Sequence, residues 1–175
     1  MWDYSKLREN VKVGSGSVIG QGCYIDKGVV VGDNCKIQNN AQIFSPSRLE
    51  DGVFVGPGVI FTNDKNPRAV DVNSRLKGDS DWQASGVVVQ HGASIGAGAI
   101  CVGPITVGTW SMVAAGAVVT RDVPAFALVA GAPAVQVGWV SRAGFRLAPS
   151  GTQLICPESG EKYEQSRSGL ELVKA

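Results

Sequence analysis

Large aliphatic residues recur in this chain at every sixth position, with polar residues and glycine between them. Counting from Leu7 gives nine consecutive hexads that end at Ile60, and the same frame returns at Val89 for five more. Of these 14 hexads, 13 begin with Leu, Ile or Val, and the exception begins with Cys101. The fourth position is Gly, Asn or Pro in every hexad but one, which has Trp110. The chain is therefore built on a six-residue repeat.

A six-residue period matches neither an amphipathic helix, which repeats about every 3.6 residues, nor an ordinary two-faced strand. Each hexad instead predicts a short strand followed by a turn, with the large first residue and the compact fifth residue facing inward. Glycine or asparagine at the fourth position tolerates the positive φ that such a corner needs. Three hexads make one triangular turn, and stacked turns form a parallel β-helix. We therefore predict an all-β solenoid.

A polar segment over residues 62–88 interrupts the repeat; it contains the Asn66-Pro67 step and no hexad. A long excursion inside a compact repeat domain is usually functional. We predict a solenoid domain over residues 1–140 that carries this excursion, and a C-terminal tail over residues 141–175. In the tail, LICPESGEKYE predicts two short strands around a turn at residues 157–160, a hairpin suited to capping the solenoid.

The composition narrows the functional classes. The 175 residues include 16 Lys and Arg against 15 Asp and Glu, and a net charge of +1 provides no basic field for nucleic acid or a membrane surface. No apolar stretch approaches the ~18 residues of a membrane span. Cys23, Cys35, Cys101 and Cys156 lack disulfide-scaffold or metal-ligand spacing, so we expect a reduced, cytoplasmic setting. The one histidine, His91, excludes a three-histidine metal site such as that of γ-class carbonic anhydrases.

Apolar residues also recur at the sixth hexad position, where a side chain points outward or lies at a corner. Single exposed apolar residues carry little meaning, whereas rows of them on a repeating lattice indicate a buried oligomer face. The residues concerned are Val18, Tyr24, Val30, Phe54, Ile60, Ile100, Met112 and Val118. We therefore expect the chain to form an oligomer.

The hexad array resembles the hexapeptide-repeat acyltransferase superfamily. Three strings narrow the resemblance to the nucleotide-linked 3-amino-sugar N-acetyltransferases: KIQNNAQIF, LEDGVFVGPGVIFTNDKNPR and GAGAVVTRDVPAFALVAGAPAVQVGWV. This resemblance covers residues 11–140 and implies a left-handed β-helix and a homotrimer that holds acetyl-coenzyme A in clefts between neighbouring helices. It also implies transfer of acetyl to the amino group of a UDP- or dTDP-linked sugar.

Such a reaction places a neutral amine against a thioester carbonyl and stabilises the tetrahedral oxyanion. Asn63 matches the family's FTN motif, in which the resemblance implies that an asparagine accepts a hydrogen bond from the amine. The alternative is that Asn63 only shapes a turn. His91 is the alternative base, because an imidazole with an ordinary pKa near 6.5 can accept a proton at neutral pH. A non-catalytic surface histidine is an equal interpretation. Asp64 is a further candidate for electrostatic assistance to the amine.

Three adjacent amides, Gln38, Asn39 and Asn40, suit either sugar hydroxyls or a ladder that stabilises stacked turns. Arg68 suits a carboxylate or phosphate, or else is a solvated loop residue. Trp82 suits stacking on a base or sugar, or else packing the excursion down.

For coenzyme A, the resemblance implies that pantetheine runs along the later coils against backbone amides, an approach that small residues permit. The candidates are Ala97, Gly98, Ala115, Gly116 and Ala132, with Arg121 meeting a coenzyme A phosphate. Relatives often end in paired cysteine elements that resemble a zinc ribbon. Here the matching strings WVSRAG and CPESG leave only Cys156, and one thiolate cannot hold a tetrahedral zinc ion, so we expect no bound metal.

Two alternatives stay open. An O-acetyltransferase acting on a small alcohol or on serine would use the same fold, because fold alone does not define function. A non-catalytic β-solenoid would show regular outward rows and would lack the long polar excursion.

Overall fold

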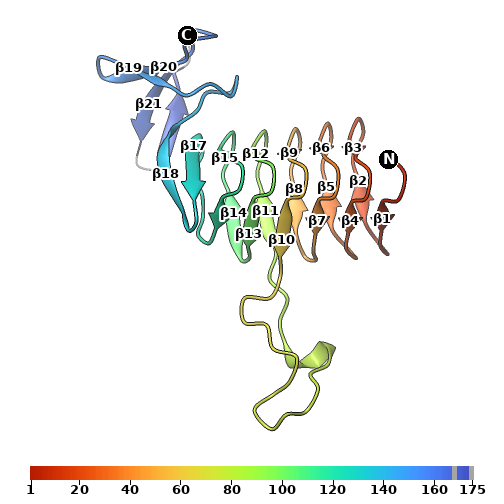
Figure 1. Cartoon of the computed structure of the whole chain (residues 1–175). Helices are drawn as coiled ribbons and strands as arrows, with labels where there is room; N and C mark the ends of the chain where they lie inside the picture. Colours follow the sequence, from red (N-terminus) through yellow and green to blue (C-terminus); the bar gives the residue numbers. More distant parts are fainter. Residues whose placement is uncertain (167–168, 174–175) are drawn as a thin grey trace.

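The computed structural model describes residues 1–166 and 169–173, which form a long three-sided solenoid followed by a small antiparallel sheet (Figure 1). The three sides, which we call faces A, B and C, are sheets of short, mostly parallel strands. Face A contains β1 (Lys6–Leu7), β4 (Tyr24–Ile25), β7 (Gln42–Ile43), β10 (Ile60–Thr62), β13 (Ile100–Val102) and β16 (Val118–Val119). Face B contains β2 (Lys12–Val13), β5 (Val30–Val31), β8 (Arg48–Leu49), β11 (Val87–Val89) and β14 (Ile105–Val107). Face C contains β3 (Val18–Ile19), β6 (Lys36–Ile37), β9 (Phe54–Val55), β12 (Ser94–Ile95), β15 (Met112–Val113), β17 (Ala127–Gly131) and β18 (Ala134–Trp139).

The register confirms the all-β solenoid predicted from the hexads. Lys6 pairs with Tyr24 and Tyr24 pairs with Gln42, so one turn takes 18 residues. From Ile19 onward, the first residue of every hexad is buried, and Ile43 and Ile95 are completely so, whereas Val13 nearer the N-terminal end is exposed. Burial of these aliphatic ladders is the main force that holds the turns together, at about 25 cal/mol for each Å² of apolar surface.

Except at Pro46 and Pro104, corners between strands take a left-handed backbone at the fourth hexad position. Glycine supplies it in most hexads, as at Gly58, where φ is +67°. Asn34 and Asn40 supply it in others, with φ of 55° and 60°. Trp110 is the unusual case, because a bulky residue holds φ at 56°. Such a backbone is costly for residues other than Gly, Asn and Asp, so Trp110 must be held by its surroundings.

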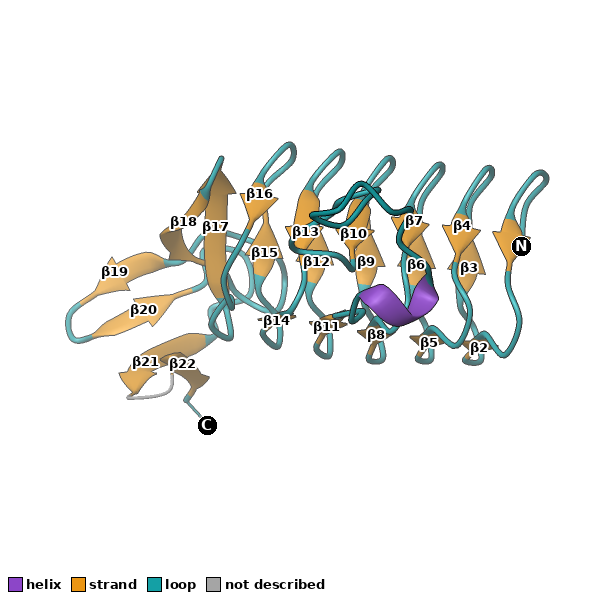
Figure 2. Ribbon diagram, turned by 90° about the horizontal axis from the view of Figure 1, so that it is seen from below, coloured by secondary structure: helices purple, strands orange, loops and turns teal. Residues whose placement is uncertain are grey.

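The excursion leaves the solenoid after β10 and returns at β11, so it replaces one corner between face A and face B. It projects from the body as an arm, and Figure 2 looks along this arm from below. Its one short helix is the 3-10 turn η1 (Asp79–Asp81). Arg75 forms ion pairs with Asp71 and Asp81, both at 3.1 Å, so the arm is ordered mainly by its own contacts.

The tail is larger than the predicted hairpin. It forms a four-stranded antiparallel sheet of β19 (Ala148–Ser150), β20 (Gln153–Ile155), β21 (Lys162–Ser166) and β22 (Gly169–Leu172). Tyr163 and Leu170 of this sheet pack with Phe126 and Trp110 at the end of the solenoid. None of the helical segments in the described part of the chain is long and apolar enough to cross a membrane.

Candidate functional site

The corners of successive turns form three edges along the solenoid, and the position of each candidate residue is given below by its edge. The A/B edge joins face A to face B and includes residues 26–29, 44–47, the arm, 103–104 and 120–122. The B/C edge includes residues 50–53, 90–93 and 108–111. The C/A edge includes residues 38–41, 56–59, 96–99 and 114–117, and the turn between β17 and β18 lies beyond them.

Asn63 is the first residue after β10, at the base of the arm on the A/B edge. Its Nδ2 donates a hydrogen bond of 2.8 Å to the carbonyl oxygen of Ser45, one coil away. Because that partner is a carbonyl, the amide must present its NH2 group there, and Oδ1 faces the other way as an acceptor. The backbone carbonyl of Asn63 accepts from the Ser85 N–H at 2.9 Å, which closes the base of the arm. Asn63 therefore shapes the turn and also presents an oriented acceptor.

A cavity of about 180 Å³ lies where the arm covers this edge. Its lining residues are Asp26, Lys27, Ser45 and Asn63 from the edge, with Asp79, Trp82 and Ala84 from the arm. Trp82 retains 38% exposure, so its indole is a partly open wall of the cavity. Sequence reasoning did not assign Asp26, Lys27 or Asp79 to a site. Asp26 stands at the second position of its hexad, where several other hexads have glycine, and this difference was the signal in the sequence that could have singled it out.

Asp26 is a buried carboxylate on one side of this cavity, only 8% exposed. It accepts hydrogen bonds from the backbone N–H groups of Lys27 at 2.8 Å and Ser45 at 3.2 Å, and from the Tyr24 hydroxyl at 3.2 Å. Arg8 approaches it at 3.4 Å. Burial raises the pKa of Asp26, but these hydrogen bonds and Arg8 outweigh burial and hold the pKa below its ordinary value. Asp26 therefore contributes an ionised carboxylate to the cavity at neutral pH.

The small residues proposed for coenzyme A gather on the C/A edge. Ala97, Gly98, Ala115 and Gly116 are all exposed there, and the Gly116 N–H donates to the Ala97 carbonyl at 2.8 Å. No other atom lies within 4 Å of the place where a side chain would start at Gly98 or Gly116. Ala132 lies in the turn between β17 and β18, beyond Ala115 on the same edge.

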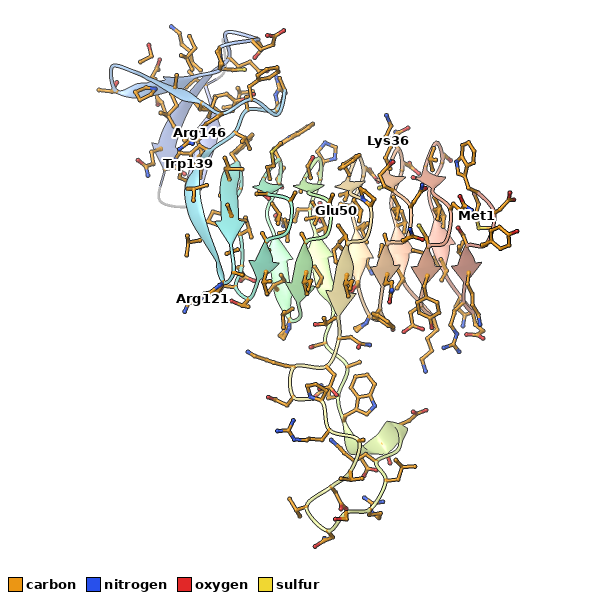
Figure 3. All side chains as sticks on the ribbon, viewed as in Figure 1. Met1, Lys36, Glu50, Arg121, Trp139 and Arg146 are labelled. Atoms are coloured by element: carbon orange, nitrogen blue, oxygen red, sulfur yellow. The ribbon has the colours of Figure 1, made fainter. Side chains whose placement is uncertain are left out.

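Arg121 lies on the A/B edge like Asn63 but two coils nearer the C-terminal end, at the lower corner in Figure 3. Strands in a sheet are about 4.8 Å apart, so roughly 10 Å separates the two residues along the solenoid. Arg121 lines a hollow of about 280 Å³ together with Val123 and Ala134. Asn63 and Arg121 therefore border one side of face A, and the small residues border its other side.

An apolar row crosses the same part of face A. Ile60 of β10 pairs with Ile100 of β13, which pairs with Val118 of β16, and all three side chains point outward and are half-buried. The oligomer expected from such rows stays a prediction.

His91 lies on the B/C edge, away from Asn63, because β11 separates the base of the arm from the corner that holds His91. Its backbone N–H donates to Glu50 Oε2 at 2.9 Å, and its ring meets the Trp110 ring edge-on at 5.2 Å between centroids. It lines a hollow of about 370 Å³ on face B with Arg48, Glu50 and Asp51. Asn63 and His91 therefore line different cavities on different edges of the solenoid.

The three adjacent amides lie on the C/A edge, towards the N-terminal end. Asn39 Oδ1 accepts from the Gln21 N–H at 3.0 Å, and the carbonyl oxygen of Gln38 lies 3.1 Å from Cys23 Sγ. Asn40 occupies a left-handed corner. The Asn39 side chain thus makes the contact of a corner ladder, while Asn39 and Asn40 also line a hollow of about 320 Å³ with Gln21. This hollow is separate from the cavity at Asn63.

Two arm candidates lie outside the cavity. Asp64 Oδ1 accepts from the Asn66 N–H at 2.9 Å in a local turn. Arg68 is exposed, and its guanidinium donates to the Pro67 carbonyl at 2.9 Å. In the tail, Cys156 Sγ lies 3.1 Å from Ser141 Oγ. The described residues contain no group of three or more His, Cys, Asp or Glu side chains placed to hold a metal ion.

Two family descriptions match parts of the chain: bacterial transferase hexapeptide (six repeats) at residues 10–45, and hexapeptide repeat of succinyl-transferase at residues 86–121. A dTDP-3-amino-3,6-dideoxy-α-D-galactopyranose 3-N-acetyltransferase from Aneurinibacillus thermoaerophilus is 40% identical over 77 residues, 44% of this chain and 40% of that protein. A serine acetyltransferase from Bacillus subtilis is 30% identical over 131 residues, 74% of this chain and 48% of that protein. The chain thus spans less than half the length of either relative.

Solved structures share the fold. A hexapeptide-repeat-containing acetyltransferase from Vibrio cholerae superposes with a TM-score of 0.61 at 26% identity, covering 73% of each chain. A second structure of that protein contains acetyl-coenzyme A and gives a TM-score of 0.64 at 24% identity, covering 76% of this chain and 72% of that chain. A GDP-perosamine N-acetyltransferase variant from Caulobacter crescentus, solved with coenzyme A and GDP-perosamine, gives 0.52 at 23% identity, covering 77% of this chain and 56% of that chain.

Proposed function

We propose that this chain, in which residues 10–45 and 86–121 match hexapeptide-repeat transferases, is an acetyl-coenzyme A-dependent N-acetyltransferase. Its acceptor is the amino group of a UDP- or dTDP-linked 3-amino sugar. The similarity to an amino-sugar N-acetyltransferase over 77 residues supports this acceptor class. The single observation that carries the proposal is the orientation of Asn63, whose Oδ1 is a free, fixed acceptor beside a cavity at the base of the arm.

In the proposed arrangement, the donor crosses face A between its two edges. Pantetheine lies against the exposed backbone at Gly98 and Gly116, where no side chain blocks its approach. Arg121 meets a phosphate of coenzyme A with a planar, permanently charged guanidinium. The apolar row that begins at Ile60 packs against a neighbouring copy in a homotrimer, so that the donor lies in a cleft between copies.

The reaction joins the amine nitrogen to the thioester carbonyl carbon, passes through a tetrahedral oxyanion and breaks the bond between carbon and sulfur. Asn63 Oδ1 accepts a hydrogen bond from the attacking amine, which points the nitrogen lone pair at the carbonyl carbon. An amide does not remove the proton that the nitrogen must lose, so this proton passes to the departing thiolate, which leaves as the thiol of coenzyme A. Because the thiolate is a good leaving group, positioning contributes most of the catalysis.

His91 is the alternative base for that proton. It lies on a different edge from Asn63, so it reaches the amine only if the B/C edge of a neighbouring copy faces this A/B edge. Asn63 therefore has the defining role in the proposed reaction, and His91 contributes to it only if copies of the chain assemble with these two edges facing.

The test measures thiol release from acetyl-coenzyme A with a panel of UDP- and dTDP-linked amino sugars. We expect Asn63→Ala to lower kcat by roughly 10- to 100-fold, and His91→Ala to lower it by less than about threefold. A loss of about 10²-fold or more confined to His91→Ala would instead make the histidine the base and leave Asn63 as a turn residue. Calorimetry that detects no binding of acetyl-coenzyme A would overturn the proposal itself.

The 30% identity to a serine acetyltransferase favours a second candidate, transfer to the hydroxyl of serine. L-serine and small alcohols therefore belong in the same panel. Thiol release with serine and with no amino sugar would replace the first candidate by the second.

A further inference from the structure

The cavity at Asn63 contains several polar side chains whose hydrogen-bonding capacity is unused. Among the described residues, the Asp79 carboxylate, the Lys27 ammonium and the indole N–H of Trp82 have no hydrogen-bond or ion-pair partner, although all three line the cavity. Asp26 in the same cavity has four donors around it. Lys27 and Asp79 are exposed, so water satisfies them in the free chain and a ligand in the cavity can take the place of that water. These side chains are therefore available to a ligand that enters beside Asn63.

The arm holds its part of this set in place. Asp81, at the end of η1, accepts hydrogen bonds from the Gly78 N–H at 2.8 Å and from Arg75 at 3.1 Å. On the other side of Trp82, the Ser85 N–H is bonded to the Asn63 carbonyl at 2.9 Å. Hydrogen bonds of the arm thus hold the backbone on both sides of Trp82.

The volume of the cavity limits the size of the ligand that it can hold. Whole small-molecule sites usually measure about 300–1,000 Å³, whereas this cavity has about 180 Å³. One ring with its substituents fits such a space, and the remainder of a larger acceptor stays outside along the arm. The partly open indole of Trp82 offers an apolar surface with one polar donor at its rim, which matches the apolar face and the hydroxyl groups of a pyranose.

The charged side chains of the cavity indicate which substituents a ligand would carry. Asp26 and Asp79 provide two carboxylates against the single ammonium of Lys27, so a ligand with a donor or cationic group is favoured beside Asp79, and an acceptor group beside Lys27. Free serine satisfies both charges but leaves the Trp82 face uncovered. An amino sugar satisfies the charges and covers the indole.

We propose that Trp82, Asp79 and Lys27 form an acceptor clamp: the sugar ring stacks on Trp82, while Asp79 and Lys27 bind its polar substituents and direct the amine to Asn63. This clamp rests on the proposed N-acetyltransferase function. It makes the arm the part of the chain that selects a ring-shaped acceptor over a small linear one.

The test compares steady-state kinetics of the full chain and its variants with a dTDP-linked 3-amino-3,6-dideoxyhexose. We expect Trp82→Ala to raise the acceptor KM about five- to tenfold with the acetyl-coenzyme A KM unchanged, and Trp82→Phe to stay within about threefold of the parent chain. Asp79→Asn should raise the same acceptor KM. Val72→Ala is the matched control, because Val72 is a fully exposed residue of the same arm outside the cavity.

The outcomes separate the clamp from the reaction. An unchanged acceptor KM in Trp82→Ala would overturn the clamp while leaving the N-acetyltransferase in place, and so would equal impairment of serine acetylation in that variant. If the parent chain releases no thiol with any amino sugar, the proposed function fails. Saturation-transfer NMR of the same sugar nucleotide then tests the clamp alone: binding that Trp82→Ala abolishes supports it, and no binding to the parent chain overturns it.

Discussion

Replacing Gly92 by alanine is the most direct test of the packing around His91. Gly92 occupies the left-handed corner of the hexad VQHGAS, with φ of +68°. A Cβ at this position would lie 2.5 Å from Cε3 of Trp110, far inside van der Waals contact. The Trp110 ring cannot move without also losing its edge-on contact with His91. Gly92→Ala should therefore disturb the corner and the histidine together.

The expected cost has two parts. A left-handed backbone costs an alanine about 1–2 kcal/mol. Displacing a packed side chain in a full core adds about 1–3 kcal/mol. Gly58 separates the two parts, because its φ is +67° and no other atom lies within 4 Å of the position that a Cβ would occupy. Gly58→Ala should lose only the first part, and Gly92→Ala should lose both.

The assay is chemical unfolding of the parent chain and the two variants at the same protein concentration, because an oligomer's stability depends on concentration. The difference between the two variants, about 1–3 kcal/mol, measures the contact with Trp110. Equal losses would refute the reasoning, since they would mean that the indole moves aside without cost. A fall in kcat confined to Gly92→Ala would also connect this corner to His91 function.

Two further predictions concern stability. The pKa of Asp26 is lower in the fold than in the unfolded chain, so its ionised form stabilises the fold above about pH 4. This contribution disappears as the pH falls through the folded pKa. The melting temperatures of Asp26→Asn and the parent chain should therefore converge in acid, and a constant gap between them would contradict this. Ile43 is completely buried, so Ile43→Ala should lower the free energy of unfolding by about 2–5 kcal/mol. Its exposed neighbour in β7, Gln42, should tolerate alanine within about 0.5 kcal/mol in the same denaturation experiment.

The FTN motif made Asn63 a candidate, and in the structure this residue lies beside a cavity at the base of the arm. Motif reasoning did not find Asp79 or Lys27 as a pair, since 52 positions of sequence separate them and only the path of the arm brings them to one cavity. It also left the three amides near Asn40 open between sugar binding and a ladder, and of these Asn39 makes the corner hydrogen bond of a ladder.

The six-residue period by itself determined the solenoid, its inward residues and its corners, because each hexad advances the chain by one face and the inward positions repeat with it. The six-residue period cannot be followed through the excursion, because a loop of arbitrary length does not determine the face on which the chain returns. Only the tertiary structure decided that the chain returns on face B, where β11 lies between β8 and β14. That choice of face places His91 on the B/C edge and Asn63 on the A/B edge, and it separates the two candidate catalytic residues within one chain.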